Sequence, residues 1–86
     1  MAKMGYVLMR YGLDESGNEI SGTALCASAS HKKVYDKIRS ILDLEKREAN
    51  ADDVIHDYDT QVVVMYGGDY EDENGVRYII EGLEIL

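Results

Sequence analysis

Carboxylates are the side chains with the most evident chemistry in this sequence, and they gather in two stretches of its second half. We expect a partner to contact both stretches, with one tyrosine as an anchor. The expected contact residues are Asp52, Asp53, Asp57, Asp69, Tyr70, Glu71, Asp72 and Glu73. Clustered carboxylates can bind a cation or attract a basic protein surface, and their spacing decides between these.

The spacing of the carboxylates argues against a calcium site. Asp69, Glu71 and Glu73 alternate like the start of a calcium loop, but Ile80 stands where the loop requires a final glutamate. Residues 14–18 alternate in the same way and place their glycine at the wrong position. We therefore expect no metal site. The segment that holds Asp52, Asp53, Asp57 and Asp59 is either a solvated acidic loop or part of a negative surface that faces a basic groove.

The other reactive residue types are scattered along the chain. Cys26 is the single cysteine, so no disulfide forms within the chain, and its small neighbours indicate a buried, inert thiol. His31 and His56 lack the spacing of metal ligands. Ser28, Ser30 and His31 are triad residue types, but adjacency in sequence does not supply triad geometry. We expect no enzymatic activity and no cofactor.

The charge is distributed unevenly. The chain has 86 residues and a formal net charge of −8. Residues 1–42 hold six basic and four acidic residues, whereas residues 43–86 hold three basic and thirteen acidic ones. An acidic half of this kind repels nucleic acid and anionic membranes and attracts basic protein surfaces.

The elements that position these residues begin with a hairpin and a helix. Residues 6–11 are rich in strand formers and apolar on both faces, which predicts an inner strand, and residues 14–18 favour a turn. A second strand of small residues follows over 19–29. Ser28 or Ser30 then caps a helix whose apolar side chains recur every three or four residues. Those side chains are Val34, Tyr35, Ile38, Ile41 and Leu42, with the stem of Glu45 as a further candidate.

The stretch after this helix has two interpretations. Asn50 can cap a short helix, with Asp52 and Asp53 in its first turn and Val54 and Ile55 buried. A loop explains the same residues equally well.

Residues 61–86 indicate a closing hairpin. Asn74-Gly75 suits a two-residue turn, because both central residues of a type I′ turn need positive φ. This turn pairs Glu73 with Val76, Tyr70 with Ile79, Tyr66 with Leu83 and Val64 with Ile85. One face of the hairpin, which should pack on the helix, collects Val62, Val64, Tyr66, Tyr70, Ile79, Leu83 and Ile85.

The other face of the hairpin remains open, because one helix cannot cover both faces of a sheet. Its partly apolar character predicts an interface with a partner or with a second copy of the chain. The expected interface residues are Val63, Met65, Tyr78 and Ile80. Glu81 is the exception on the apolar face: a bulge at the neighbouring glycines would turn it outward, and otherwise it is a half-buried carboxylate.

These elements predict a single α+β domain over residues 1–86. Its four-stranded, mostly antiparallel sheet consists of two β-hairpins, with one amphipathic helix on one face and an optional second short helix (ββαββ). The lone thiol fits a reducing cytoplasm. The N-terminal apolar stretch is too short for a signal peptide, and no run approaches the roughly 20 apolar residues of a membrane span.

The layout resembles small accessory proteins encoded by phages and prophages. The similarity lies in the opening strand (residues 5–11), the small residues 27–30 and the final strand Val-Arg-Tyr-Ile-Ile-Glu-Gly-Leu-Glu-Ile (residues 76–85). Some proteins of this kind are acidic inhibitors of host defence nucleases, including anti-CRISPR proteins, and others capture signalling nucleotides.

Charge and resemblance together give three functional hypotheses. The first is a non-enzymatic, acidic module that blocks a basic, nucleic-acid-binding surface of a host defence protein, with no direct contact to nucleic acid or membrane. The second is an oligomer, such as a homodimer, that binds a signalling nucleotide between open sheet faces. The third is a structural accessory subunit.

Overall fold

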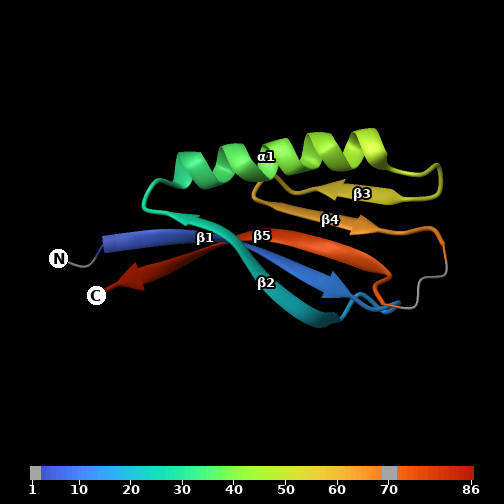
Figure 1. Cartoon of the computed structure of the whole chain (residues 1–86), viewed down its shortest axis with the longest axis horizontal. Coiled ribbons are helices and arrows are strands. Elements are labelled where there is room, and N and C mark those ends of the chain that lie inside the picture. The colour runs from blue at the N-terminus through green and yellow to red at the C-terminus, as the bar shows by residue number, and fades with distance from the viewer. Residues whose placement is uncertain (1–2, 69–71) are drawn as a thin grey trace.

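The structure is a computed structural model that describes residues 3–68 and 72–86. One helix lies across one face of a five-stranded antiparallel sheet (Figure 1). The elements are β1 (Lys3–Leu13), β2 (Glu19–Ser28), α1 (His31–Glu48), β3 (Val54–Asp57), β4 (Gln61–Met65) and β5 (Gly75–Ile85), and the strand order is β2-β1-β5-β4-β3. The α+β class is confirmed, and the expected number of strands is one too few.

The opening hairpin forms as its turn residues predict. The Asp14 carboxylate accepts hydrogen bonds from the backbone N–H groups of Ser16 (2.9 Å) and Asn18 (2.8 Å). Gly17 has a φ of +82°, which glycine adopts without steric penalty. β1 lies between β2 and β5 and is therefore an inner strand, as its two apolar faces predict.

The helix begins where a serine caps it and packs through one stripe of side chains. The Ser30 hydroxyl accepts a hydrogen bond from the backbone N–H of Lys33 (3.4 Å). Val34, Ile38 and Leu42 are at most 1% exposed. They form the core together with Leu8, Val62, Val64, Val76 and Tyr78. Among the described residues, no helix is both long and apolar enough to cross a membrane.

A fifth strand replaces the second helix or loop expected after α1. Asn50 and Asp53 close a turn on each other: the N–H of Asp53 donates to the Asn50 carbonyl, and the N–H of Asn50 donates to the Asp53 carboxylate, both at 3.0 Å. The chain then extends as β3, in which Ile55 lies opposite Val64 of β4. The prediction of a helix capped by Asn50 is wrong, because the chain extends and pairs with β4 from Val54 onward, whereas the alternative of a loop holds for residues 49–53.

The register of the closing hairpin also differs from the prediction. Val64 lies opposite Val76, not Ile85. Asn74-Gly75 is not a two-residue turn: Gly75 is the first residue of β5, and the N–H of Asn74 donates to the carbonyl of Leu13 on β1 (2.8 Å). Residues 66–74 form the longer connection between β4 and β5. The register of β5 is therefore determined by its pairing with β1, a strand distant in sequence.

The change of register reverses the two faces of β5. An odd shift in pairing moves every side chain of a strand to the opposite face of the sheet. Tyr78, which is 7% exposed, and Ile80 therefore pack in the core under α1, and their assignment to the open face is wrong. Val63 and Met65 neighbour the core-facing Val62 and Val64 on β4, so they lie on the open face as predicted.

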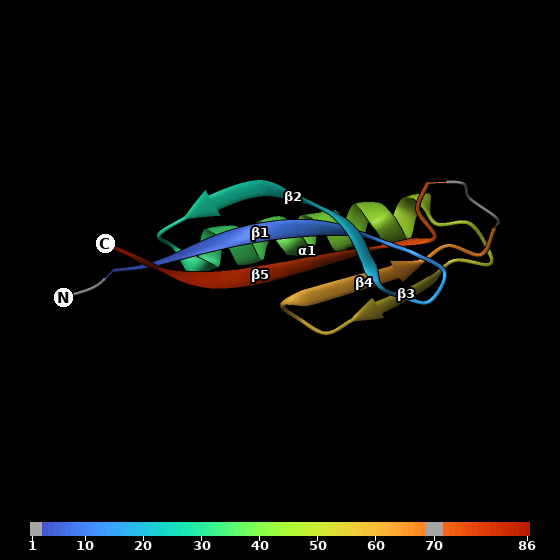
Figure 2. The ribbon, with the colours of Figure 1, turned by 90° about the horizontal axis from the view of Figure 1, so that it is seen from below.

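β5 also pairs along its whole length with β1, so the two ends of the chain meet in the centre of the sheet (Figure 2). In this pairing Glu81 lies opposite Val7 of β1, and it points to the open face. The Tyr11 hydroxyl donates to the Glu81 carboxylate at 2.6 Å. Glu81 is thus turned away from the helix without a bulge in β5, because the pairing of β5 with β1 has no register shift.

Candidate functional site

The end of α1, the turn after it and the loop after β4 meet at one end of the molecule, opposite the chain termini (Figure 1). The N–H of Gly67 donates to the Asp53 carboxylate at 3.0 Å. The Gly67 backbone lies so close to the turn that an added Cβ would come within 2.2 Å of the Asp52 Cβ. We call residues 45–53, with the described part of 66–73, the acidic end.

The acidic end contains a shallow hollow of about 260 Å³. Its lining consists of Glu45, Glu48, Ala49, Asn50, Asp53 and Tyr66. Three of these six side chains are carboxylates, and the C-terminus of α1 adds the negative end of the helix dipole. The volume lies below the roughly 300–1,000 Å³ of typical small-molecule pockets, so the hollow suits a single cationic side chain.

An arginine beneath this region holds one of the predicted contact residues. Arg10 on β1 donates two hydrogen bonds to the Glu73 carboxylate, at 2.9 and 2.8 Å. These bonds hold the pKa of Glu73 below its ordinary value. An added Cβ on Gly12 would come within 2.2 Å of the Glu73 Oε2, so the glycine makes room for the pair. The Glu73 carboxylate therefore has a structural role.

Two tyrosines connect the hollow to the core. The Tyr78 hydroxyl donates to Glu45 Oε1 at 2.9 Å, and burial, followed by this hydrogen bond, raises the pKa of Tyr78 to about 12. Burial and the nearby Glu45 carboxylate likewise raise the pKa of Tyr66. Both phenols therefore keep their protons at neutral pH.

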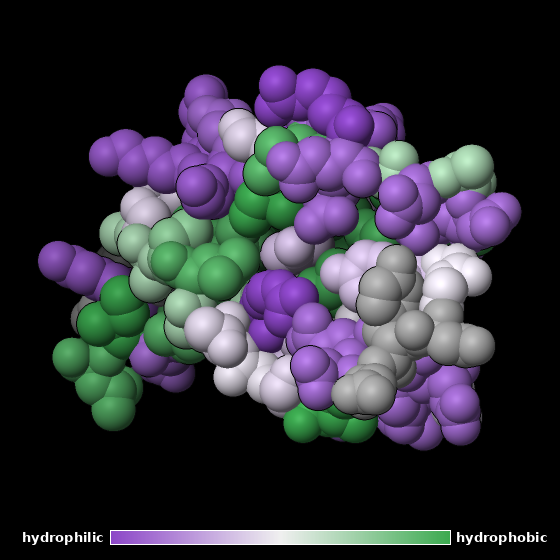
Figure 3. Space-filling view, turned by 45° about the vertical axis from the view of Figure 1, so that its right-hand side comes forward, coloured by the Kyte–Doolittle hydropathy of each residue, from purple (hydrophilic) through white to green (hydrophobic). Residues whose placement is uncertain are grey.

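The remaining carboxylates of the acidic end divide into two groups. The Asp53 oxygens accept from the N–H groups of Asn50 and Gly67, so Asp53 holds the turn against the loop. Glu48, Asp52 and Asp72 are exposed. These three carboxylates can reach a partner without breaking a described contact of Asp53 or Glu73. Figure 3, which turns this end toward the viewer, shows hydrophilic side chains around it.

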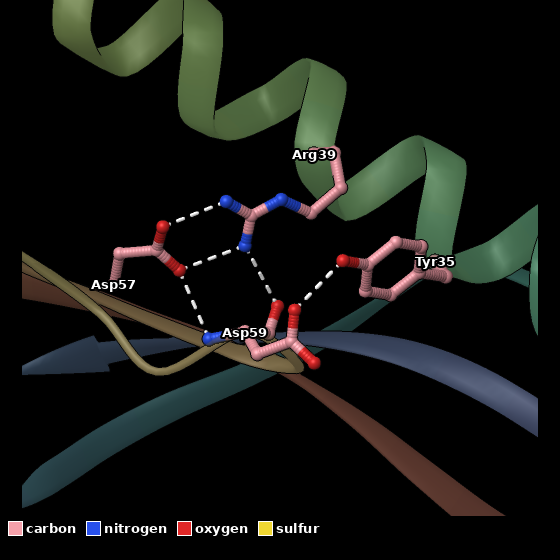
Figure 4. Close-up of polar contacts among 4 residues, drawn as sticks. All are labelled: Tyr35, Arg39, Asp57 and Asp59. Atoms are coloured by element: carbon pink, nitrogen blue, oxygen red, sulfur yellow. Dashed lines mark hydrogen bonds and ion pairs between the residues drawn. The ribbon is translucent and has the colours of Figure 1, made fainter.

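Asp57, expected to contribute to the acidic surface, lies elsewhere (Figure 4). It accepts two hydrogen bonds of 2.7 Å from Arg39 in the middle of α1 and a third of 2.9 Å from the N–H of Asp59. These bonds lower the pKa of Asp57, and the hydrogen bonding from Arg39 has the largest effect. Tyr35 donates to the Asp59 carboxylate at 2.7 Å. The four residues tie the β3–β4 turn to the helix, so Asp57 has a structural role.

Sequence reasoning located part of this site. The structure brings Asp52 and Asp53 beside the loop that contains Asp72 and Glu73, as predicted. The predicted residues Asp69, Tyr70 and Glu71 lie outside the described residues. Sequence reasoning did not identify Arg10, Glu45 and Glu48 as parts of the site. Arg10 carried a signal, since it is the single charged residue within the expected strand 6–11.

The other reactive residue types do not converge on a second site. The His31 ring meets Tyr6 edge-on at 5.0 Å, and the His56 ring stacks on Tyr58 at 5.9 Å. Cys26 is partly buried against the core. Within residues 3–68 and 72–86, no group of three or more His, Cys, Asp or Glu side chains is placed to hold a metal ion.

No protein-family model, curated protein or solved structure matches the chain.

Proposed function

We propose that this protein is a non-enzymatic module that binds a basic protein surface, with a lysine or arginine of the partner entering the hollow at the acidic end. The observation that carries the proposal is the lining of the hollow. Glu45, Glu48 and Asp53 share one concavity at the negative end of α1. The concavity gives a basic side chain both a charge partner and a shape to fit.

The charge of the whole chain supports the same partner. A net charge of −8 on 86 residues attracts a basic surface from a distance and accelerates the encounter. Surfaces that bind nucleic acid have this chemistry, so competition with nucleic acid for such a surface is the inhibitory mode that we favour. The same carboxylates oppose the phosphates of a nucleotide, which disfavours the hollow as a nucleotide site.

The test is a titration of a fluorescent peptide of ten arginines, followed by anisotropy at about 20 and about 200 mM salt. Raising the salt shortens the screening length from about 20 Å to about 7 Å, so we expect the affinity to fall at least tenfold. Glu48→Gln should weaken binding roughly three- to tenfold at the lower salt, which corresponds to about 0.7–1.4 kcal/mol.

The matched control is Glu84→Gln. It removes the same charge from an exposed position near the chain termini, at the end of the molecule opposite the hollow (Figure 1). We expect Glu84→Gln to bind the peptide as the wild type does. Equal losses in both variants, or an affinity that does not depend on salt, would refute the proposal.

A further inference from the structure

We propose that two copies of this chain pack their open sheet faces against each other to form a homodimer. The open face is the side of the sheet that points away from α1 (Figure 2). Its central side chains are Val7, Met9, Val63, Met65, Ile79 and Leu83. This inference does not depend on the proposed function, because the acidic end lies beyond the end of the helix and not on this face.

The first argument is the pattern of side chains on the face. An antiparallel sheet with a solvated face carries polar residues on that side, in alternation with apolar residues on the packed side. In β4 both sides are apolar: Val62 and Val64 face the core, and Val63 and Met65 face away from it. Exposed aliphatic side chains extend the apolar surface, since Leu83 is 48% exposed. Apolar side chains on the uncovered side of a sheet are typical of an interaction site.

The second argument is charge, and it selects a second copy as the occupant. The register places four charged strand residues on the open face: Lys3, Glu19, Arg77 and Glu81. Two are basic and two acidic, so the face is neutral, although the chain has a net charge of −8. Two copies of a protein with this charge repel each other over most of their surfaces. The open face is where they can meet with the least repulsion.

The third argument is that charged groups of the face already have partners within the chain. Arg77 donates to the side chains of Glu19 and Gln61. Glu81 accepts the hydrogen bond from Tyr11. Covering a charged group with a second sheet is unfavourable mainly when the group is left unpaired. These pairs reduce that penalty.

The fourth argument is area. The strands contain 11, 10, 4, 5 and 11 residues. With a rise of about 3.3 Å per residue and a strand spacing of about 4.8 Å, they cover about 650 Å² of sheet. Two such faces bury about 1,300 Å², which falls within the roughly 1,200–2,000 Å² of a stable interface. Face-to-face packing of two sheets, about 10 Å apart, is the geometry expected.

The test is sedimentation equilibrium of the full chain between about 1 and 100 μM, a range that brackets a micromolar dissociation constant. We expect a monomer–dimer equilibrium. Met9→Lys should weaken the dimer at least tenfold, because two-fold symmetry places a charge in each half of the interface. Lysine matches methionine in length and lack of branching, and circular dichroism with thermal unfolding verifies that the monomer remains folded. Leu83→Lys provides a second variant at a more exposed position.

Leu44→Lys is the matched control. Leu44 is a similarly exposed aliphatic residue, at 45%, but it lies on α1 and not on the sheet. The dimer should survive this change. A strict monomer at every concentration would overturn the inference, as would a dimer that both Met9→Lys and Leu83→Lys leave intact. A dimer that is lost only on substituting Thr23, in the edge strand β2, would place the contact at the sheet edge and also overturn it.

Discussion

Removing the hydroxyl of Tyr78 tests two features at once: the register of β5 and the hydrogen bond between Tyr78 and Glu45, which lines the hollow. Tyr78→Phe keeps the ring and deletes only the oxygen, which donates to Glu45 Oε1 at 2.9 Å. In the observed register the side chain is 7% exposed, so the hydroxyl is shielded from bulk water. In the register predicted from the Asn74-Gly75 turn, the same side chain would point to the open face and its hydroxyl would be solvated.

The expected loss of stability in Tyr78→Phe follows from the hydrogen-bond partner, the Glu45 carboxylate. A hydrogen bond to a charged group contributes about 1.5–3 kcal/mol to stability. Glu45 is partly exposed, so water can replace the lost donor, and we take the lower value of about 1.5 kcal/mol. For a domain of 60–100 residues, this loss lowers Tm by roughly 6–12 °C. Urea unfolding at pH 7 and thermal unfolding, both followed by circular dichroism, measure the change.

Alkaline pH gives an independent measurement of the same hydroxyl. The pKa of Tyr78 is raised from 10.0 to about 12, so the folded state retains a proton that the unfolded state loses between these values. Its contribution is therefore complete below pH 10 and is lost as the pH rises toward 12. The shift corresponds to about 3 kcal/mol of stability lost on ionisation. This exceeds the mutational estimate because its larger cause, burial, penalises only the charged phenolate, which is absent at pH 7.

Tyr58→Phe is the control, because Tyr58 is 57% exposed on the β3–β4 turn, and it should change Tm little. The reasoning is refuted if Tyr78→Phe is as stable as Tyr58→Phe at pH 7. It is refuted equally if the variant retains every high-pH step of the tyrosine absorbance titration.

Three further predictions concern the core, the ion pairs and the acidic end. Ile38→Ala should destabilise the protein by about 2–5 kcal/mol in urea unfolding, because Ile38 is fully buried; the exposed Leu44→Ala should change stability by no more than about 0.5 kcal/mol. The pKa values of Glu73 and Asp57 lie below 4.5 and 3.8, their unfolded values, so the stability from both pairs is complete above about pH 5 and is lost as the pH falls through the folded values. The urea midpoint of Glu73→Gln should therefore fall less between pH 5 and pH 3 than that of the wild type, and parallel curves would contradict the Arg10–Glu73 pair. Gly67→Ala should lower stability by about 1–3 kcal/mol, because the added Cβ meets Asp52 Cβ at 2.2 Å and the Asp52 carbonyl at 2.5 Å; unchanged stability would show that the turn and the loop are not in contact.

Local signals in the sequence predicted the helix and the first hairpin correctly, because the interactions that determine them are local. The Ser30 cap reaches only to Lys33, and the turn of the first hairpin closes on Asp14. The closing hairpin is different. Asn74-Gly75 is a strong local turn signal, but Asn74 bonds to Leu13, a residue far away in sequence. Pairing with β1 thus overrides the preference of Asn74-Gly75 for a two-residue turn. The sequence pattern of residues 61–86 alone contains no information about this pairing.

The candidate site was likewise predicted only as far as local signals in the sequence allow. The acidic residues were found by composition, which identifies charge but not its partners. Glu73 and Asp57 were expected to face a partner, but arginines from β1 and α1 hold them. Only the stem of Glu45 was considered, as part of the apolar side of the helix, and Glu48 was overlooked beside Lys46 and Arg47 in the last turns. Only the folded chain separates the carboxylates that line the hollow from the basic side chains beside them.

The pairing of β1 with β5 has a consequence for how the chain folds. Lys3 lies opposite Ile85, and Leu13 lies opposite Gly75, so the centre of the sheet joins segments from the two ends of the sequence. Such distant contacts close large loops and slow folding. Without β5, the hairpin β1–β2 and the hairpin β3–β4 share no strand, and among the described elements only α1 connects them. During synthesis the sheet therefore stays divided until β5 has left the ribosome, and we expect the sheet to form in a single cooperative step that requires β5.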